Sequence, residues 1–213
     1  MDAQQKFRLR IHYCKQGRLV YLSHLEVARA LERAVRRARL PYAISQGYSP
    51  HMKIAFGSAL PVGVGGEDEI CDLQLVSYIA PDKALKALRE SSCSDLMVHA
   101  CAYIEPHAKA ASVALPISTY CAKFSMPPES FVLPETITIV RKKKEKTLVV
   151  KDFLVDQPRL DNDAYIFSLE AKPTGSLRTD LLIKTALRDY NLSHPDVPLR
   201  LISLIRQSQR ESS

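Results

Sequence analysis

The sequence predicts an α+β protein made of two ferredoxin-like units, each a split βαβ arrangement with an antiparallel sheet, side by side. The first half gives the element order strand, helix, strand, strand, helix, strand, which is the order of that arrangement. The second half repeats the order more loosely, without sequence identity between the halves. The stretch EPHAKAASVALP reads as a linker. We therefore expect an N-terminal unit at 1–107, a C-terminal unit at 117–208 and a frayed tail at 209–213.

The first predicted strand is residues 7–14, where apolar and polar side chains alternate. Alternation with a period of two is typical of a strand with one buried face. The apolar face contains Phe7, Leu9, Ile11 and Tyr13, and the other face contains Arg8, Arg10 and His12. We expect the basic face to be the outer one.

A helix is predicted to open at Ser23, because Glu26 follows three residues later and completes a capping box. Pro41 ends it. Helical spacing predicts a buried stripe of Leu25, Ala28, Leu31, Val35 and Ala38. The same spacing directs Arg29, Arg33, Arg36 and Arg37 largely toward solvent.

The rest of the first half contains three further strands and one helix. Pro81 suits the first turn of a helix over 81–91. Strands are expected at 51–60, 69–78 and 96–104. In the second half, strands are expected near 117–124, 135–141, 146–151, 164–171 and 198–206, and the clearest helix at 177–188.

Size and composition indicate a folded globular protein. The 213 residues are 46% hydrophobic and 25% charged, which are ordinary globular values. No apolar run approaches the roughly 20 residues of a membrane span, and the N-terminus lacks the apolar core of a signal peptide. We therefore expect a cytoplasmic protein without a membrane partner.

The five cysteines contain no CxxC pair, so we expect neither a zinc ribbon nor an iron–sulfur cluster held by this chain alone. The carboxylates at 67–72 do not match a calcium loop, and PVGVGG is neither a P-loop nor GxGxxG. The sequence thus predicts no metal and no cofactor.

Positive charge is concentrated at the start of the chain. Residues 1–60 hold eleven Lys and Arg against three Asp and Glu, whereas the remainder holds nineteen against twenty. All of the net charge of +7 therefore comes from the first quarter. Such an asymmetry indicates an anionic partner, and phosphate is the anion we expect.

Two segments would contact that partner. Guanidinium groups along the first helix match phosphate oxygens, and the loop SQGYSPHMK offers hydrogen-bond donors with a stacking surface. A solvated helix face and a structural turn are the alternatives. The basic hairpin tip RKKKEK adds charge alone. The expected nucleic-acid contacts are Arg18, Arg29, Arg33, Arg36, Arg37, Ser45, Gln46, Tyr48, His51, Lys53, Arg141, Lys142, Lys143 and Lys144.

Two histidines raise the question of catalysis. His24 and His51 are weak candidates for the general acid and base of a metal-independent RNA cleavage, because an imidazole titrates near neutral pH. The sequence does not place them near each other. Whether the protein is an enzyme is thus open, and we favour a protein without catalysis.

The chain also resembles a known family over residues 7–76. The pieces YLSHLE, RALERAVRRARLP, SQGYSPHMKI and LPVGV, followed by an acidic stretch and Asp72, resemble the radical SAM-linked protein family. Over the second half the resemblance is mostly GSLRTDLL at 175–182. Ser49 stands where that family usually has asparagine. The resemblance implies a bacterial protein of unknown function that works beside a radical S-adenosylmethionine enzyme.

Three hypotheses follow from the sequence. The first is an RNA-binding accessory module that presents RNA to a partner radical SAM enzyme. The second is an RNA endonuclease that uses histidine acid–base chemistry. The third is a protein-docking subunit without RNA affinity.

Overall fold

The computed structural model describes residues 7–141, 144–173 and 175–212, but only the backbone of residues 140, 141 and 144. It is a mixed α+β structure with four α-helices in this described part. Strand pairs within each part of the chain are antiparallel. The α+β class predicted from the sequence is confirmed.

The chain divides into two compact units. The first comprises Met1–Val62 and Gly66–Leu115, and the second comprises Gly63–Gly65 and Pro116–Ser213. The break at Leu115 falls inside the stretch that the sequence marked as a linker.

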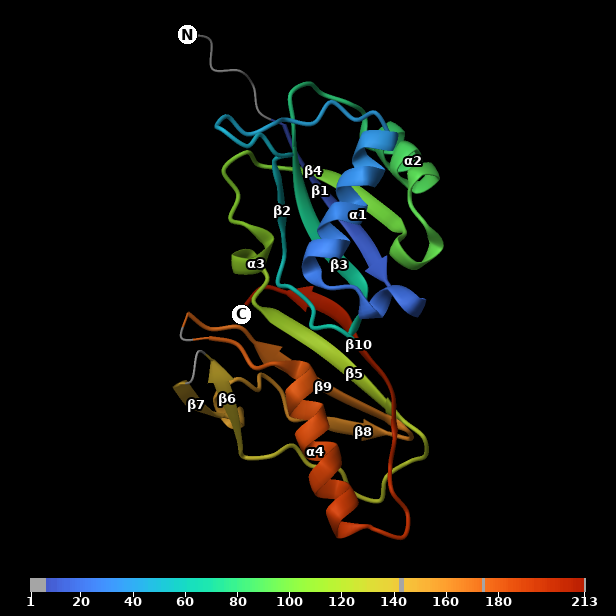
Figure 1. Cartoon of the computed structure of the whole chain (residues 1–213), viewed down its shortest axis with the longest axis vertical. Coiled ribbons are helices and arrows are strands. Elements are labelled where there is room, and N and C mark those ends of the chain that lie inside the picture. Colours follow the sequence, from blue (N-terminus) through green and yellow to red (C-terminus); the bar gives the residue numbers. More distant parts are fainter. Residues whose placement is uncertain (1–6, 142–143, 174, 213) are drawn as a thin grey trace. The chain divides into compact units, whose positions relative to one another are not determined.

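The N-terminal unit is a four-stranded antiparallel sheet with two helices on one face (Figure 1). Its strands are β1 (Phe7–Lys15), β2 (Ile54–Phe56), β3 (Gly65–Leu75) and β4 (Val98–Ile104). The strand order is β4-β1-β3, with β2 paired to the other side of β3. Its helices are α1 (His24–Arg37), α2 (Pro81–Ser91), the short α3 (Ala111–Ala114) and the 3-10 helices η1 (Gly17–Tyr21) and η2 (Ser94–Leu96).

The core of this unit lies between the sheet and the helices. Leu9 and Leu73 face each other across β1 and β3 and are fully buried. Leu31 of α1 and Leu88 of α2 belong to the same buried cluster, so both helices pack on one face of the sheet. The alternation predicted for residues 7–14 is confirmed, since Leu9, Ile11 and Tyr13 are buried.

The buried stripe predicted for the first helix is partly wrong. Val27, Leu31, Ala34 and Val35 are the buried residues of α1, whereas Leu25 is 66% exposed. Val27 and Leu25 are two residues apart, and thus about 200° apart around the helix axis. A helix that buries Val27 must therefore expose Leu25.

Two predicted segments differ in extent. β2 is shorter than the predicted strand at 51–60. The backbone N–H of Lys53 donates a hydrogen bond to Ala43 O, so the residues before β2 pair with the segment around Ala43 instead of continuing the strand. The predicted linker packs on the N-terminal unit: Arg8 donates a hydrogen bond to Ala108 O, and Ala111 of α3 is buried.

The C-terminal unit contains four antiparallel strands of a sheet and a separate hairpin. Its sheet order is β10-β5-β9-β8. These strands are β5 (Ile117–Phe124), β8 (Arg159–Asp161), β9 (Ala164–Glu170) and β10 (Leu201–Arg210). The hairpin consists of β6 (Thr136–Arg141) and β7 (Lys144–Val149). The unit also contains the helix α4 (Thr179–Ser193) and the 3-10 helix η3 (Val150–Asp152). Aromatic rings fill its core: Phe131 lies 4.6 Å from Phe124 and 4.9 Å from Tyr165 between ring centroids.

The end of the chain is more ordered than the predicted frayed tail. β10 continues to Arg210, which pairs with Ile117 of β5. Ser212 then donates a hydrogen bond to Glu170 at 2.7 Å. Strand pairing thus extends into the segment 209–213. No helix in the described part of the chain is long and apolar enough to span a membrane.

Candidate functional site

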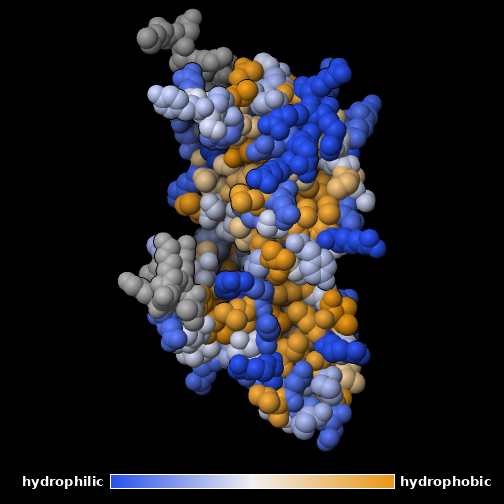
Figure 2. Space-filling view, viewed as in Figure 1, coloured by the Kyte–Doolittle hydropathy of each residue, from blue (hydrophilic) through white to orange (hydrophobic). Residues whose placement is uncertain are grey.

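The exposed face of α1 gathers four arginines. Ser23 caps the helix, since its hydroxyl accepts from the backbone N–H of Glu26 while the Glu26 carboxylate accepts from Ser23 N–H, as the capping box predicted. All four arginine side chains are exposed: Arg29, Arg33, Arg36 and Arg37. At about 100° per residue they fall within an arc of about 100°. Figure 2 shows strongly hydrophilic surface over α1.

Little negative charge offsets these arginines. Arg36 lies 3.4 Å from Glu32, one turn earlier, in an exposed pair of the kind worth well under 1 kcal/mol. Glu26 is held at the cap, where hydrogen bonds from Ser23 lower its pKa. Within the described residues, no ion pair is recorded for Arg29, Arg33 or Arg37. Most of the positive field therefore remains available to an outside anion.

A groove runs along one flank of this arginine face. It has a volume of about 250 Å³ and is lined by Arg33 and Arg37 together with Leu19, Leu22, Ala30, Ala34, Ser92, Cys93 and Leu96. Arg37 is oriented by a hydrogen bond from Nη2 to Ser91 O at 2.6 Å. Arg18 lies exposed in η1, and it does not line the groove. The sequence did not reveal the groove, because η1 and η2 come together only through the fold.

The Ser45–Lys53 loop is built on its own hydrogen bonds. Ser45 N–H bonds to His51 O at 2.8 Å, and Ser45 Oγ accepts from His51 N–H at 3.0 Å. Gly47 has φ +145°, in the region that favours glycine. These bonds shape the loop, which agrees with the alternative interpretation of the segment as a structural turn. Gln46, Tyr48 and Lys53 nevertheless stay exposed to solvent.

The Nδ1 atom of His51 lies between two oxygen atoms of its own loop. It is 2.9 Å from Ser45 Oγ and 3.2 Å from Ser49 O. Both contacts stay within the loop and add to the hydrogen bonds that shape it. The His51 side chain remains exposed to solvent.

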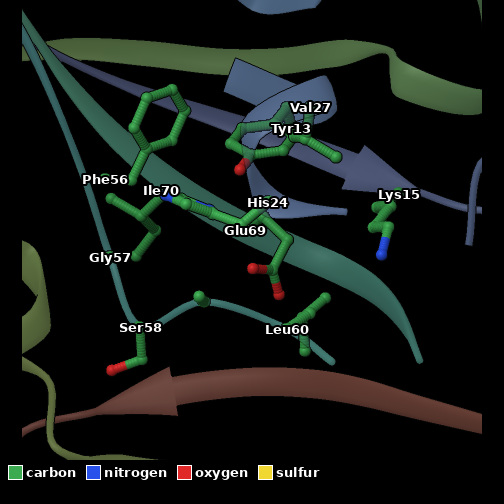
Figure 3. A pocket seen from close by; sticks show the side chains of 11 residues that line it. Tyr13, Lys15, His24, Val27, Phe56, Gly57, Ser58, Leu60, Glu69 and Ile70 are labelled. Carbon is green, nitrogen blue, oxygen red and sulfur yellow. The ribbon is translucent and has the colours of Figure 1, made fainter. Parts of the chain in front are cut away.

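His24 lies in different surroundings. Its ring meets Phe56 edge-on at 5.2 Å between centroids. It lines a cavity of only about 10 Å³, room for about one water, beside Tyr13, Lys15 and Glu69 (Figure 3). No contact between His24 and His51 is recorded in the described part of the chain. The structure does not bring the two candidate catalytic histidines together.

The other face of the sheet carries an ion-pair network that the sequence did not predict. Asp72 Oδ2 lies 2.7 Å from Arg8 Nη2, and Asp72 Oδ1 lies 2.8 Å from Arg10 Nε. The Asp72 carboxylate is 1% exposed, and its hydrogen bonds raise the pKa of Arg10. A cavity of about 420 Å³ adjoins it, lined also by Lys53, Gln74 and His107. Arg10 and Asp72 are cross-strand partners, so the correct strand register would have revealed the pair.

A second polar group lies further along the same strands. His12 Nδ1 hydrogen-bonds to Asp68 Oδ1 at 2.7 Å, and this bond lowers the pKa of Asp68. His99 Nε2 approaches the same oxygen at 3.3 Å. Among the described residues, no group of three or more His, Cys, Asp or Glu is arranged to hold a metal ion.

Part of the predicted site cannot be compared with the structure. The side chains of Arg141, Lys142, Lys143 and Lys144 lie outside the described residues. The backbone of the first and last of them ends β6 and begins β7. The segment RKKKEK therefore remains a prediction as a contact surface.

Comparisons with other proteins give one match to a family. A family model described as "Uncharacterized protein conserved in bacteria" (DUF2344) matches residues 8–189. No curated protein matches the chain.

Two solved structures show weak similarity. "Crystal Structure of a Cbf5-Nop10-Gar1 Complex" is similar over 94% of this chain, with 14% identity and a TM-score of 0.43. The chain covers 48% of that protein, about half of its length. "Crystal Structure of an Unknown Protein from Galdieria sulphuraria" is similar over 98% of this chain and 100% of that one, with 7% identity and a TM-score of 0.28. Neither similarity is close enough to bear on function.

Proposed function

This chain belongs to the bacterial family DUF2344, whose model matches residues 8–189, and from that premise we propose that it is an RNA-binding accessory protein. One observation carries the proposal. Four exposed arginines share one face of α1, and among the described residues only Arg36 forms a salt bridge, while Arg29 has a weaker interaction with the charge of Glu26. RNA is a polyanion that can meet all four at once.

Arginine suits this role for a geometric reason. Its planar guanidinium donates paired hydrogen bonds to phosphate oxygens and stacks on bases. Successive arginines one turn apart on α1 are spaced to follow a phosphate backbone. The Ser45–Lys53 loop adds Tyr48 as a stacking surface and Lys53 as a further cation.

The strand order of each unit is compatible with the proposal but does not by itself indicate RNA binding. We infer that both units are ferredoxin-like, and the strand orders β4-β1-β3-β2 and β10-β5-β9-β8 support this. In the second unit, the β6–β7 hairpin occupies the chain position of the first helix. Fold alone does not fix function, so RNA binding depends on the arginines.

We further propose that the RNA is presented to a partner radical SAM enzyme in the bacterial cytoplasm. The similarity of YLSHLE and SQGYSPHMKI to radical SAM-linked proteins supports this partner. Recovery of such an enzyme with the tagged chain from its own cell extract, before and after nuclease treatment, tests it. Recovery that persists after nuclease, from a chain with no RNA affinity, would favour the docking subunit instead.

Filter binding with total cellular RNA tests the main proposal. Arg33→Glu with Arg37→Glu should weaken binding at low salt by roughly tenfold or more, since each charge-assisted hydrogen bond contributes about 1.5–3 kcal/mol. Lys83→Glu with Lys86→Glu, exposed on α2, makes the same change in charge and is the matched control. Equal RNA binding by the two double variants would reject the proposal.

The endonuclease hypothesis has its own test. If the protein cleaves labelled RNA without added metal, and the His51→Ala variant does not, the protein is an endonuclease instead.

A further inference from the structure

We infer that the groove beside α1 is a pocket for one unpaired nucleotide, with its base against the apolar wall and its phosphate on Arg33 and Arg37. The inference rests on the proposed function and extends it, because it names single-stranded RNA as the class that this face selects. The groove lies in the N-terminal unit alone, between α1, η1 and the segment that leads into η2.

The floor and walls of the groove are apolar. Leu96 is 3% exposed, and Leu19 and Leu22 are partly buried against the same core. Ala30 contributes a small side chain from α1, so the wall beside it is open rather than filled. A flat aromatic ring placed here would cover apolar surface that water now contacts, which is favourable.

The rim of the groove is cationic. Arg33 and Arg37 lie one turn apart on α1, and the bond to Ser91 O fixes the second guanidinium in place. None of the described residues that line the groove is acidic. A ligand that is apolar at one end and anionic at the other matches this distribution, and a nucleotide is such a ligand.

The size of the groove favours a single nucleotide. Its volume of about 250 Å³ is below the roughly 300–1,000 Å³ of pockets for whole drug-sized molecules. Paired bases are stacked inside a duplex and cannot enter, whereas bases of single strands turn outward freely. The groove should therefore distinguish single-stranded from double-stranded RNA.

Filling the groove without changing charge tests the inference. Ala30→Phe places a ring where the base would lie, and we expect affinity for a single-stranded oligonucleotide to fall by about tenfold, the loss of one stacked base. The salt dependence of binding should not change, because the arginines remain. Ala28→Phe, on the same helix but outside the groove, is the matched control, and circular dichroism verifies that both variants fold.

Cys93 provides a second measurement that needs no substitution. Its exposed thiol lines the groove, so a bound base should slow its alkylation by iodoacetamide, read by mass spectrometry. We expect protection by a single-stranded oligonucleotide and much less by a duplex of equal length. Ala30→Phe binding as tightly as the unmodified protein, or equal protection by duplex, would overturn the inference. The proposed function would fail separately, if Arg33→Glu with Arg37→Glu left RNA binding intact.

Discussion

Asp72 is the residue whose removal should cost this protein the most stability on the polar face of its N-terminal sheet. Its carboxylate is 1% exposed and accepts hydrogen bonds from both Arg8 and Arg10. Asp72→Ala leaves two partly buried guanidinium groups without their shared anion. Breaking a buried ion pair costs about 3–5 kcal/mol, and we expect about 3 kcal/mol because both arginines keep some contact with water.

Urea unfolding followed by circular dichroism measures this loss. Glu105→Gln, an exposed carboxylate of the same unit, is the control and should leave the midpoint almost unchanged. A loss below about 1 kcal/mol for Asp72→Ala would mean that the network is no stronger than a surface salt bridge.

Asp68 should make stability depend on acid pH. The hydrogen bond from His12 lowers its pKa, with a smaller contribution from the charge of His99. A carboxylate whose pKa is lower in the folded state stabilises the fold above its unfolded pKa of about 3.9, and this contribution disappears as pH falls through the folded value. Because the side chain is 37% exposed, solvent screens the effect to less than about 1 kcal/mol.

Asp68→Asn removes this dependence. The free energy of unfolding, measured at pH 6 and again below pH 4, should fall less for the variant than for the unmodified protein. Glu67→Gln, at the exposed neighbouring position, should behave like the unmodified protein. Identical pH profiles for Asp68→Asn and the unmodified protein would show that the bond to His12 contributes nothing.

The sequence could place these residues on a face but could not pair them. Alternation in β1 correctly separated Arg10 from Leu9. The carboxylate opposite Arg10 is 62 residues away, and its register depends on how β3 pairs along its whole length. Local sequence patterns do not show which residues 62 positions apart become cross-strand partners. In the sequence, Asp72 was therefore only one of several acidic residues at 67–72.

At the scale of elements, α1 depends on its cap. The Ser23 hydroxyl accepts from Glu26 N–H at the N-terminus, where helix N–H groups otherwise lack partners. Ser23→Ala should destabilise the protein by about 1 kcal/mol, the usual cost of losing such a cap. Thermal unfolding measures the change, and Ser23→Asp should restore most of the stability. A substitution to alanine without effect would show that tertiary packing alone holds this end of α1.

The elements best predicted were those with a local start and stop. The capping box at Ser23 and Pro81 at a first helical turn located the starts of α1 and α2, although α1 ends at Arg37, earlier than the stop expected at Pro41. β8 and α3 were missed, because three or four residues carry too little periodicity to read. The groove was missed for a related reason: Leu19 and Leu96 belong to short 3-10 turns that meet only in the folded unit.

At the scale of the whole molecule, charge is distributed unevenly along the chain, with a surplus of positive charge in residues 1–60. The surplus of positive charge in residues 1–60 is exposed mainly on α1. Arg8 and Arg10 do not add to this exposed charge, because both form salt bridges with the buried carboxylate of Asp72. The sequence counts all these charges alike. Only the fold separates arginines that hold the sheet from arginines that face solvent, and the second group alone can attract a polyanion over distance.

This separation predicts that the position of charge, rather than its total, decides RNA affinity. Changing Arg29, Arg33, Arg36 and Arg37 to Gln lowers the net charge from +7 to +3. The same change in total charge follows from substituting four exposed cations of the C-terminal unit by Gln: Lys123, Lys151, Arg159 and Lys184.

The two quadruple variants should therefore differ although their net charges agree. The α1 variant should lose most binding, and the slope of log affinity against log salt should shrink by about 0.7 for each phosphate of a single strand that the variant no longer neutralises. The C-terminal variant should keep both its affinity and its slope, apart from a small general decrease. Fluorescence anisotropy with one labelled oligonucleotide over a series of salt concentrations measures both quantities. Equal decreases in the two variants would mean that RNA senses only the total charge, and α1 would then be an ordinary solvated helix.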